Sequence, residues 1–187
     1  MTGALNTGAQ PVTGASAESL PVTYQDWSVS YGKRRFAEYG EAEARRRYTA
    51  REGFWILFGD PDHPQVVVEV EPERYSVEVT FLDGQLRRST TYLFVPEKFD
   101  DPDLILLAQH RRLRYDTDDA WAPSTADAAW IKPDGHWYRA KRIDPGPLVE
   151  TRGQLTADQL AELIEPFPAF GDWSGITRHR QLPPGPG

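Results

Sequence analysis

Arg88 is the residue of this chain whose predicted surroundings most suggest chemistry. Residues 75–81 alternate between apolar and polar side chains, which is the period of a half-buried strand. If Asp83 and Gly84 close a two-residue turn, Arg88 falls opposite Val79 on the apolar face of a hairpin. A buried guanidinium needs a counter-charge, so this position would bind an anionic ligand or a carboxylate.

Three aromatic residues would bound such a ligand cavity together with Arg88, namely Trp55, Tyr75 and Tyr92. A simpler alternative is a β-bulge or register shift that moves Arg88 away from the apolar face, or a position at the sheet's open end from which it reaches water. We favour this alternative because bulges are common at sheet edges. A ligand-binding or enzymatic cup with Arg88 as anion anchor is therefore our second hypothesis.

A second group of residues indicates a protein contact. Trp121 lies in an acidic segment beside Asp118 and Asp119, and an aromatic anchor surrounded by charge is typical of interface hot spots. Trp130 and Trp137 lie on a second predicted hairpin and could extend this surface. We predict that these five residues bind a partner protein, with the alternative that Trp121 folds back against the sheet.

Motifs for catalysis and metal binding are missing from the sequence. There is no nucleophile elbow and no glycine-rich phosphate loop. The histidines lack the spacing of a metal site, and the acidic loops lack the glycine and distal glutamate of a calcium loop. Four positions carry histidine: His63, His110, His136 and His179. We therefore expect no cofactor, no metal ion and no catalytic residue.

Three glutamates could in principle form a carboxylate pair for hydrolysis: Glu69, Glu71 and Glu78. The alternation places them on the face opposite the apolar one, where surface charge is expected. The case for an enzyme is weak on this ground.

The composition narrows the classes of partner. Asp and Glu number 28 against 21 Lys and Arg, giving a net charge of −7, which argues against nonspecific nucleic-acid binding and suits a basic partner protein. Cysteine is absent, so disulfides and thiolate metal sites are excluded. No apolar run approaches a membrane span and no secretory signal begins the chain, so we expect a cytoplasmic protein without membrane contact. The bias toward Arg, Ala, Gly and Pro suggests a bacterial source with a GC-rich genome.

The predicted elements would position these residues. We expect a short strand at 27–31, a helix at 34–50, and a meander of strands at 54–58, 65–71, 75–81 and 86–95. A helix at 103–114 follows, with a strand through 104–107 as its competitor. A hairpin of 129–131 and 136–143 comes next. Thr156 and Gln159 form a capping box that opens a last helix. Residues 1–21 are a disordered leader and 181–187 a flexible tail.

These elements predict one domain over 22–180 of the α+β class, an antiparallel β-meander sheet with helices packed on one face. In element order and acidity the chain is similar to small bacterial secretion chaperones and, more loosely, to immunity proteins that neutralise toxins, without a shared motif. Our first hypothesis is a non-catalytic acidic protein-binding module. The third, after the cup, is a subunit whose long strands pair in a homo-oligomer such as a homodimer.

Overall fold

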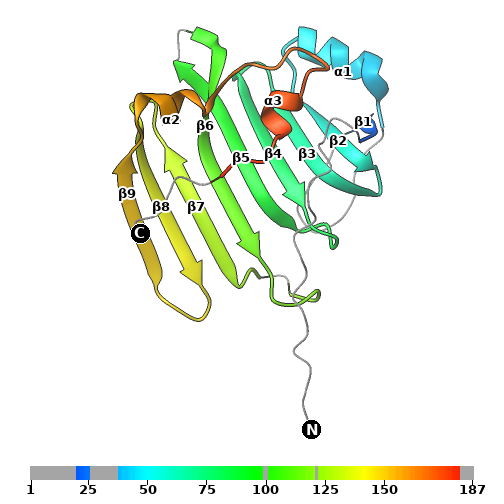
Figure 1. Cartoon of the computed structure of the whole chain (residues 1–187). Helices are drawn as coiled ribbons and strands as arrows, with labels where there is room; N and C mark the ends of the chain where they lie inside the picture. The colour runs from blue at the N-terminus through cyan, green and yellow to red at the C-terminus, as the bar shows by residue number, and fades with distance from the viewer. Residues whose placement is uncertain (1–19, 26–37, 99–100, 121, 182–187) are drawn as a thin grey trace.

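The protein is built on one twisted antiparallel sheet (Figure 1). The computed structural model describes residues 20–25, 38–98, 101–120 and 122–181. Of these residues 52% lie in strands and only 13% in three short helices. The predicted α+β class, with helices packed on one face of the sheet, is therefore wrong: this is a β protein.

The strands follow one another in space as they do in the sequence, and each pairs antiparallel with the next. In chain order they are β1 (Val22–Tyr24), β2 (Phe54–Asp60), β3 (His63–Glu71), β4 (Ser76–Leu82), β5 (Arg88–Lys98), β6 (Asp101–Arg114), β7 (Thr125–Ile131), β8 (His136–Ile143) and β9 (Leu148–Gln154). A tenth strand, β10 (Ile164–Pro166), returns to pair with the first part of β6, while β7 pairs with the last part.

The predicted meander from β2 to β5 is confirmed, but its register is not. We expected Val79 opposite Val66 and Arg88, whereas it lies opposite Val68 and Tyr92. Both shifts are even numbers of residues, and alternate residues share a face. The valines of β3 and β4 therefore still point into one core.

Each register error comes from a turn that is longer than predicted. Between β3 and β4, Glu71 pairs with Ser76 and Tyr75 adopts a positive φ of 50°.

The second error comes from the turn between β4 and β5. The Asp83 carboxylate accepts hydrogen bonds from the backbone N–H groups of Gln85 and Arg87, each at 2.9 Å, and Leu86 adopts a positive φ of 58°. The connection is therefore longer than the predicted two-residue turn at Asp83 and Gly84.

The predicted helix at 103–114 is wrong, because the segment belongs to strand β6. Ile105, Leu106 and Leu107 are all buried. A strand covered on both faces gives a continuous apolar run without alternation, and periodicity cannot distinguish such a run from a buried helix.

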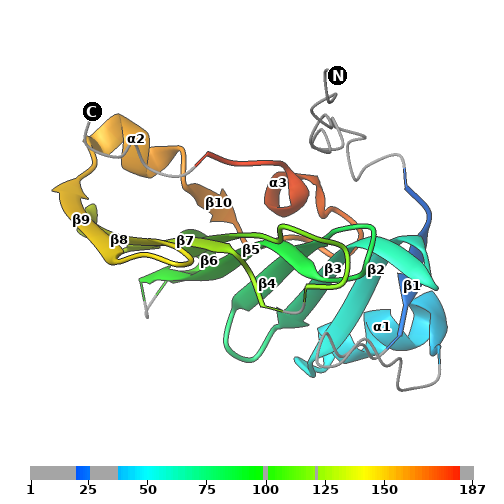
Figure 2. The same cartoon turned by 90° about the horizontal axis from the view of Figure 1, so that it is seen from below.

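The helices are short and are spread along the sheet. Helix α1 (Gly40–Thr49) lies beside β1 and β2 at one end, α2 (Ala157–Ala161) lies near β8 and β9 at the other, and α3 (Ser174–Thr177) lies between them (Figures 1 and 2). The capping box of Thr156 and Gln159 is confirmed. However, α2 ends after five residues, and the chain then enters β10.

The main core lies on one face of β2 to β6. We call the face that carries Val68, Val79 and Tyr92 the inner face, and the opposite face, with Trp55 and Glu69, the outer face. The segment after α2 crosses the inner face and covers it with apolar side chains. Those in contact with the core are Leu163, Phe167, Phe170, Trp173 and Ile176.

Other predictions fall on residues that the structure does not describe. The strand at 27–31 lies wholly among them, and the leader at 1–21 and the tail at 181–187 do so almost entirely. Within the described residues, none of the helices has the length and apolar character needed to cross a membrane.

Candidate functional site

Strands β8 and β9, which we call the open end, are the least covered part of the sheet. Every residue from 141 to 150 is exposed. Ile143, Leu148 and Val149 keep 54–56% of their surface exposed although they are apolar. In the described chain β9 pairs with β8 alone, so its other edge leaves backbone N–H and C=O groups free for a further strand.

The side chains of β9 alternate between the two faces. Leu148, Glu150 and Arg152 lie on the outer face, and Val149 and Thr151 lie on the inner face.

Aromatic rings of β8 hold both faces of β9 in place. On the outer face the Tyr138 hydroxyl donates to Glu150 at 2.6 Å, and the guanidinium of Arg152 lies 5.6 Å from the Tyr138 ring. On the inner face the Trp137 ring lies so close to Gly153 that a Cβ added there would be 2.6 Å from it. A larger residue at position 153 would clash with this ring, so Gly153 allows Trp137 to pack directly against β9.

The structure describes four of the five predicted partner-binding residues, and two of these, Trp130 and Trp137, lie on opposite faces of the sheet. Trp121 lies outside the described residues. Asp118 and Asp119 are exposed in the loop before β7. Trp130 is 38% exposed and packs against Tyr138 on the outer face, whereas Trp137 lies on the inner face.

The four residues of the alternative cup also lie apart. A bulge between Phe81 and Leu82 turns Arg88 to the outer face, as the alternative to the cavity predicted. There its guanidinium is 4.0 Å from the Glu78 carboxylate.

The cup's aromatic residues are divided between the two faces and a turn. Tyr92 is buried on the inner face, where its hydroxyl accepts from the Arg180 backbone N–H at 2.8 Å. Trp55 is on the outer face, and Tyr75 lies in the β3–β4 turn with its ring against Phe167. The four residues therefore do not lie on one face of the sheet, as the cup requires.

Two of the glutamates considered as a carboxylate pair do meet. Glu69 and Glu78 are direct cross-strand neighbours on the outer face. Burial raises the pKa of Glu69, and the negative charges of Glu78 and Glu71 raise it further. A hydrogen bond from Trp55 and the charge of Arg88 oppose the shift. The shift thus concerns Glu69, which already interacts with Trp55 and Arg88 on the outer face.

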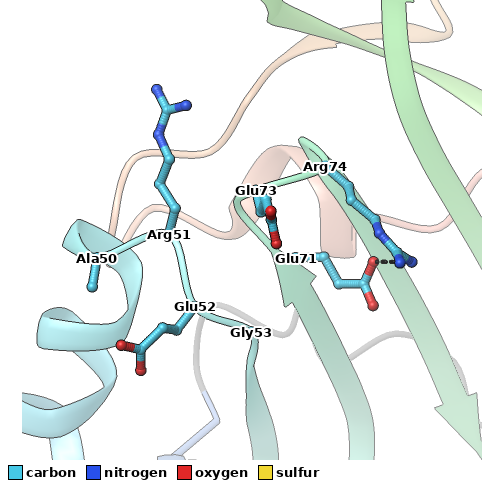
Figure 3. Close-up of a pocket in the computed structure, with 7 residues that line it drawn as sticks. All are labelled: Ala50, Arg51, Glu52, Gly53, Glu71, Glu73 and Arg74. Carbon is cyan, nitrogen blue, oxygen red and sulfur yellow. Dashed lines mark hydrogen bonds and ion pairs between the residues drawn. The ribbon is translucent and has the colours of Figure 1, made fainter.

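An open pocket of about 620 Å³ lies between the end of α1 and the β3–β4 turn (Figure 3). Its charged side chains largely neutralise one another: Arg74 is 3.3 Å from Glu71, and Glu52 pairs with Arg46 at 2.7 Å. Arg51 lies over the Tyr75 ring at 5.2 Å. Such a lining lacks the apolar walls typical of small-molecule sites.

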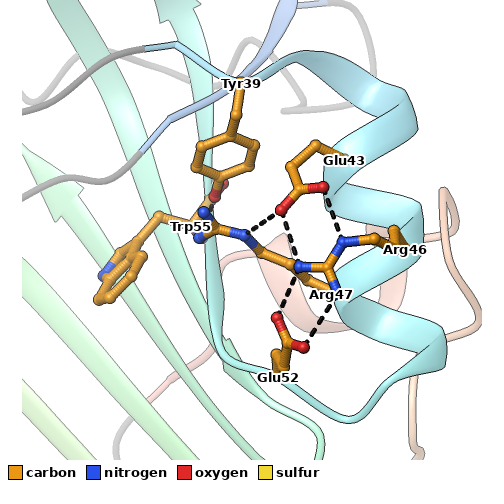
Figure 4. A network of polar contacts seen from close by, with 6 residues as sticks. All are labelled: Tyr39, Glu43, Arg46, Arg47, Glu52 and Trp55. Carbon is orange, nitrogen blue, oxygen red and sulfur yellow. Dashed lines mark hydrogen bonds and ion pairs between the residues drawn. The ribbon is translucent and has the colours of Figure 1, made fainter.

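The polar network on α1 attaches the helix to the sheet (Figure 4). Glu43 accepts hydrogen bonds from Arg46 and Arg47, and these hydrogen bonds lower the pKa of Glu43 to about 2. Arg47 lies over the Tyr39 ring, whose hydroxyl donates to the Trp55 carbonyl and accepts from its N–H. This arrangement serves attachment, since its groups are already satisfied by one another.

His110 is a buried polar residue, and nothing in its spacing from the other histidines indicates this. It is 1% exposed on the inner face, edge-on to Tyr92, and neither ring nitrogen makes a well-aligned hydrogen bond. Burial lowers its pKa to about 4, and the charge of Arg112 adds to the shift. Beside it, Asp127 and Arg139 form an ion pair at 2.7 Å. The neutral imidazole is thus held in the interior.

Comparisons of the chain with protein-family models, curated proteins and solved structures found no match. Among the described residues, no three His, Cys, Asp or Glu side chains gather in a way that could hold a metal ion. The open end is therefore the candidate functional site that the geometry supports best.

Proposed function

We propose that this protein is a non-catalytic protein-binding module that contacts its partner through the open end of the sheet. The observation that carries the proposal is the coincidence of a free strand edge with three exposed apolar side chains, Ile143, Leu148 and Val149. Free edges accept an added strand through backbone hydrogen bonds, while side-chain contacts select the partner.

The charge of the open end differs from that of the whole chain. The net charge of −7 predicts a basic partner, and the outer face of β3 and β4 carries acidic residues that suit one. The strands of the open end instead carry four basic residues against the single carboxylate of Glu150, namely Arg139, Lys141, Arg142 and Arg152. Arg139 is already paired with Asp127 of β7. This positive charge would not attract a basic partner, so contact with one there would depend mainly on apolar and backbone groups and should resist salt.

The test is to capture proteins from a lysate of the source organism on the immobilised full chain, at low and at high salt. We expect the same protein to be retained at both salt concentrations by the wild type. The Val149→Asp variant should lose it, because an aspartate would place a charge in the contact. Val22→Asp is the matched control, since Val22 is 43% exposed on β1 at the opposite edge.

Two outcomes would contradict the proposal. If Val149→Asp retained the protein as well as Val22→Asp does, the open end would not be the contact. If salt alone released it, binding through the acidic residues, as the composition predicts, would replace binding through the open end.

The geometry argues against the alternative function, an anion-binding cup around Arg88. Tyr92 lies on the face opposite Arg88 and Trp55, and the Arg88 guanidinium already lies near Glu78.

A further inference from the structure

We propose that the partner of the open edge is a second copy of this chain, whose β9 pairs antiparallel with the first across a two-fold axis at Thr151. This inference rests on the proposed function and names the partner. The two sheets would then form one continuous sheet.

Of the features that keep sheet edges from pairing, strand β9 has only charged side chains, Glu150 and Arg152, and their opposite signs can pair across the edge. It is seven residues long, and its pairing with β8 shows no register shift. It contains neither proline nor lysine, although proline, lysine, bulges and short length are the usual protections of an edge. The edge at the other end of the sheet, β1, is protected by its length of three residues.

Charge favours this register over the two neighbouring ones. With the axis at Thr151, Glu150 of each copy lies directly opposite Arg152 of the other, on the outer face. Residues of one face must remain on one side of a continuous sheet, so the second strand can slide only by two residues at a time. Each such step moves the two-fold axis by one residue. Moving the axis to Glu150 places two glutamates opposite each other, and moving it to Arg152 places two arginines opposite each other. Like charges in direct opposition are destabilising.

The inner face fits the same register. Thr151 would lie opposite Thr151 of the second copy, and Thr–Thr pairs are favourable across strands. Val149 would lie opposite Gly153, which has no side chain to obstruct it and is covered by the Trp137 ring. The exposed valine of each copy would thus reach the edge of an indole in the other, and part of its apolar surface would be buried.

A charge exchange tests the register in the full chain. By sedimentation equilibrium we expect a particle of twice the 21.2 kDa chain mass. Glu150→Arg or Arg152→Glu alone should weaken the dimer about tenfold, because each turns two attractive pairs into repulsive ones. The double variant should restore it. Glu73→Arg makes the same charge change in an exposed turn and is the control.

Cross-linking tests the axis directly, because the chain contains no cysteine. Opposed residues in an antiparallel pair have Cα atoms roughly 4.5–5.5 Å apart, within the range a disulfide spans. Under oxidation, Thr151→Cys should form a covalent dimer, whereas Glu150→Cys, Arg152→Cys and the distant Val22→Cys should not.

The inference is overturned if the wild type sediments as a monomer at all concentrations, or if the double variant associates no better than the single ones. Cross-linking at position 150 or 152 in place of 151 would also overturn it. A monomer whose capture of another protein is abolished by Val149→Asp would leave the proposed function standing without the dimer.

Discussion

Strands β2 to β5, which we call the covered half, and the open end share one topology but differ in what their side chains meet. On β3 the inner face carries Val66, Val68 and Val70, all less than 5% exposed. On β8 the same face carries Lys141 and Ile143, which are both exposed. A meander can therefore extend beyond its own core, since each added strand needs only one neighbouring strand for its backbone hydrogen bonds. The strands beyond the core then offer surface for contact.

The largest expected effect is the difference between what a core side chain and an open-end side chain contribute to the free energy of unfolding. Phe54 is fully buried and its ring packs near Tyr48, Phe170 and Trp173. Phe54→Ala should lower the free energy of unfolding by about 3–5 kcal/mol, through lost burial and the cavity left behind. Urea denaturation measures this loss.

The matched change at the open end is Val149→Ala, which should alter the free energy of unfolding by less than about 0.5 kcal/mol, because the side chain is exposed. Similar losses for Phe54→Ala and Val149→Ala would show that the open end is part of the folding core.

The next effect is a pH dependence at the border between the two regions. The pKa of His110 is lowered to about 4, so between about pH 6.5 and pH 4 the unfolded chain binds a proton that the folded chain does not. The stability from this group is complete above pH 6.5 and is lost as the pH falls, by about 3 kcal/mol in total. His110→Phe should remove this part of the pH dependence. An unchanged slope in that variant would show that other groups cause it.

A smaller effect concerns the turn that sets the β5 register. The Arg87 side chain is only 11% exposed; it pairs with Asp83 at 2.7 Å and donates to the carbonyls of Thr117, Asp118 and Ala120. Arg87→Lys keeps the charge but cannot make this fork of hydrogen bonds. It should cost about 2 kcal/mol and speed hydrogen exchange in residues 117–120. Unchanged exchange there would mean that the loop is held by other contacts.

The covered half could be predicted from the sequence because its inner face is largely apolar and buried. On the outer face Leu57 and Val67 are buried as well. Alternation at Val77, Val79 and Phe81 follows directly from the burial of the inner face.

The register of β5 could not be predicted, since the carboxylate of Asp83 stabilises a longer turn than the Asp-Gly pair suggests. The register of β3 against β4 was missed because their turn spans residues 72–75.

The open end could not be predicted for the opposite reason. Residues 148–154 are largely exposed on both faces, so no apolar alternation marks them as a strand. The sequence therefore did not indicate the candidate site, and the predicted partner contact was placed at the tryptophans instead. The available signal was subtler: Glu150 and Arg152 are placed symmetrically about Thr151, and that symmetry acquires meaning only once the segment is known to be an edge.

Hydrogen exchange of the backbone amides of β9, measured in dilute and in concentrated protein, tests the central claim most directly. Concentrated protein should protect the amides within 148–154 more strongly than dilute protein, while those of β3 stay equally protected in both. Equal protection of β9 at both concentrations would contradict pairing of the open edge with a second copy.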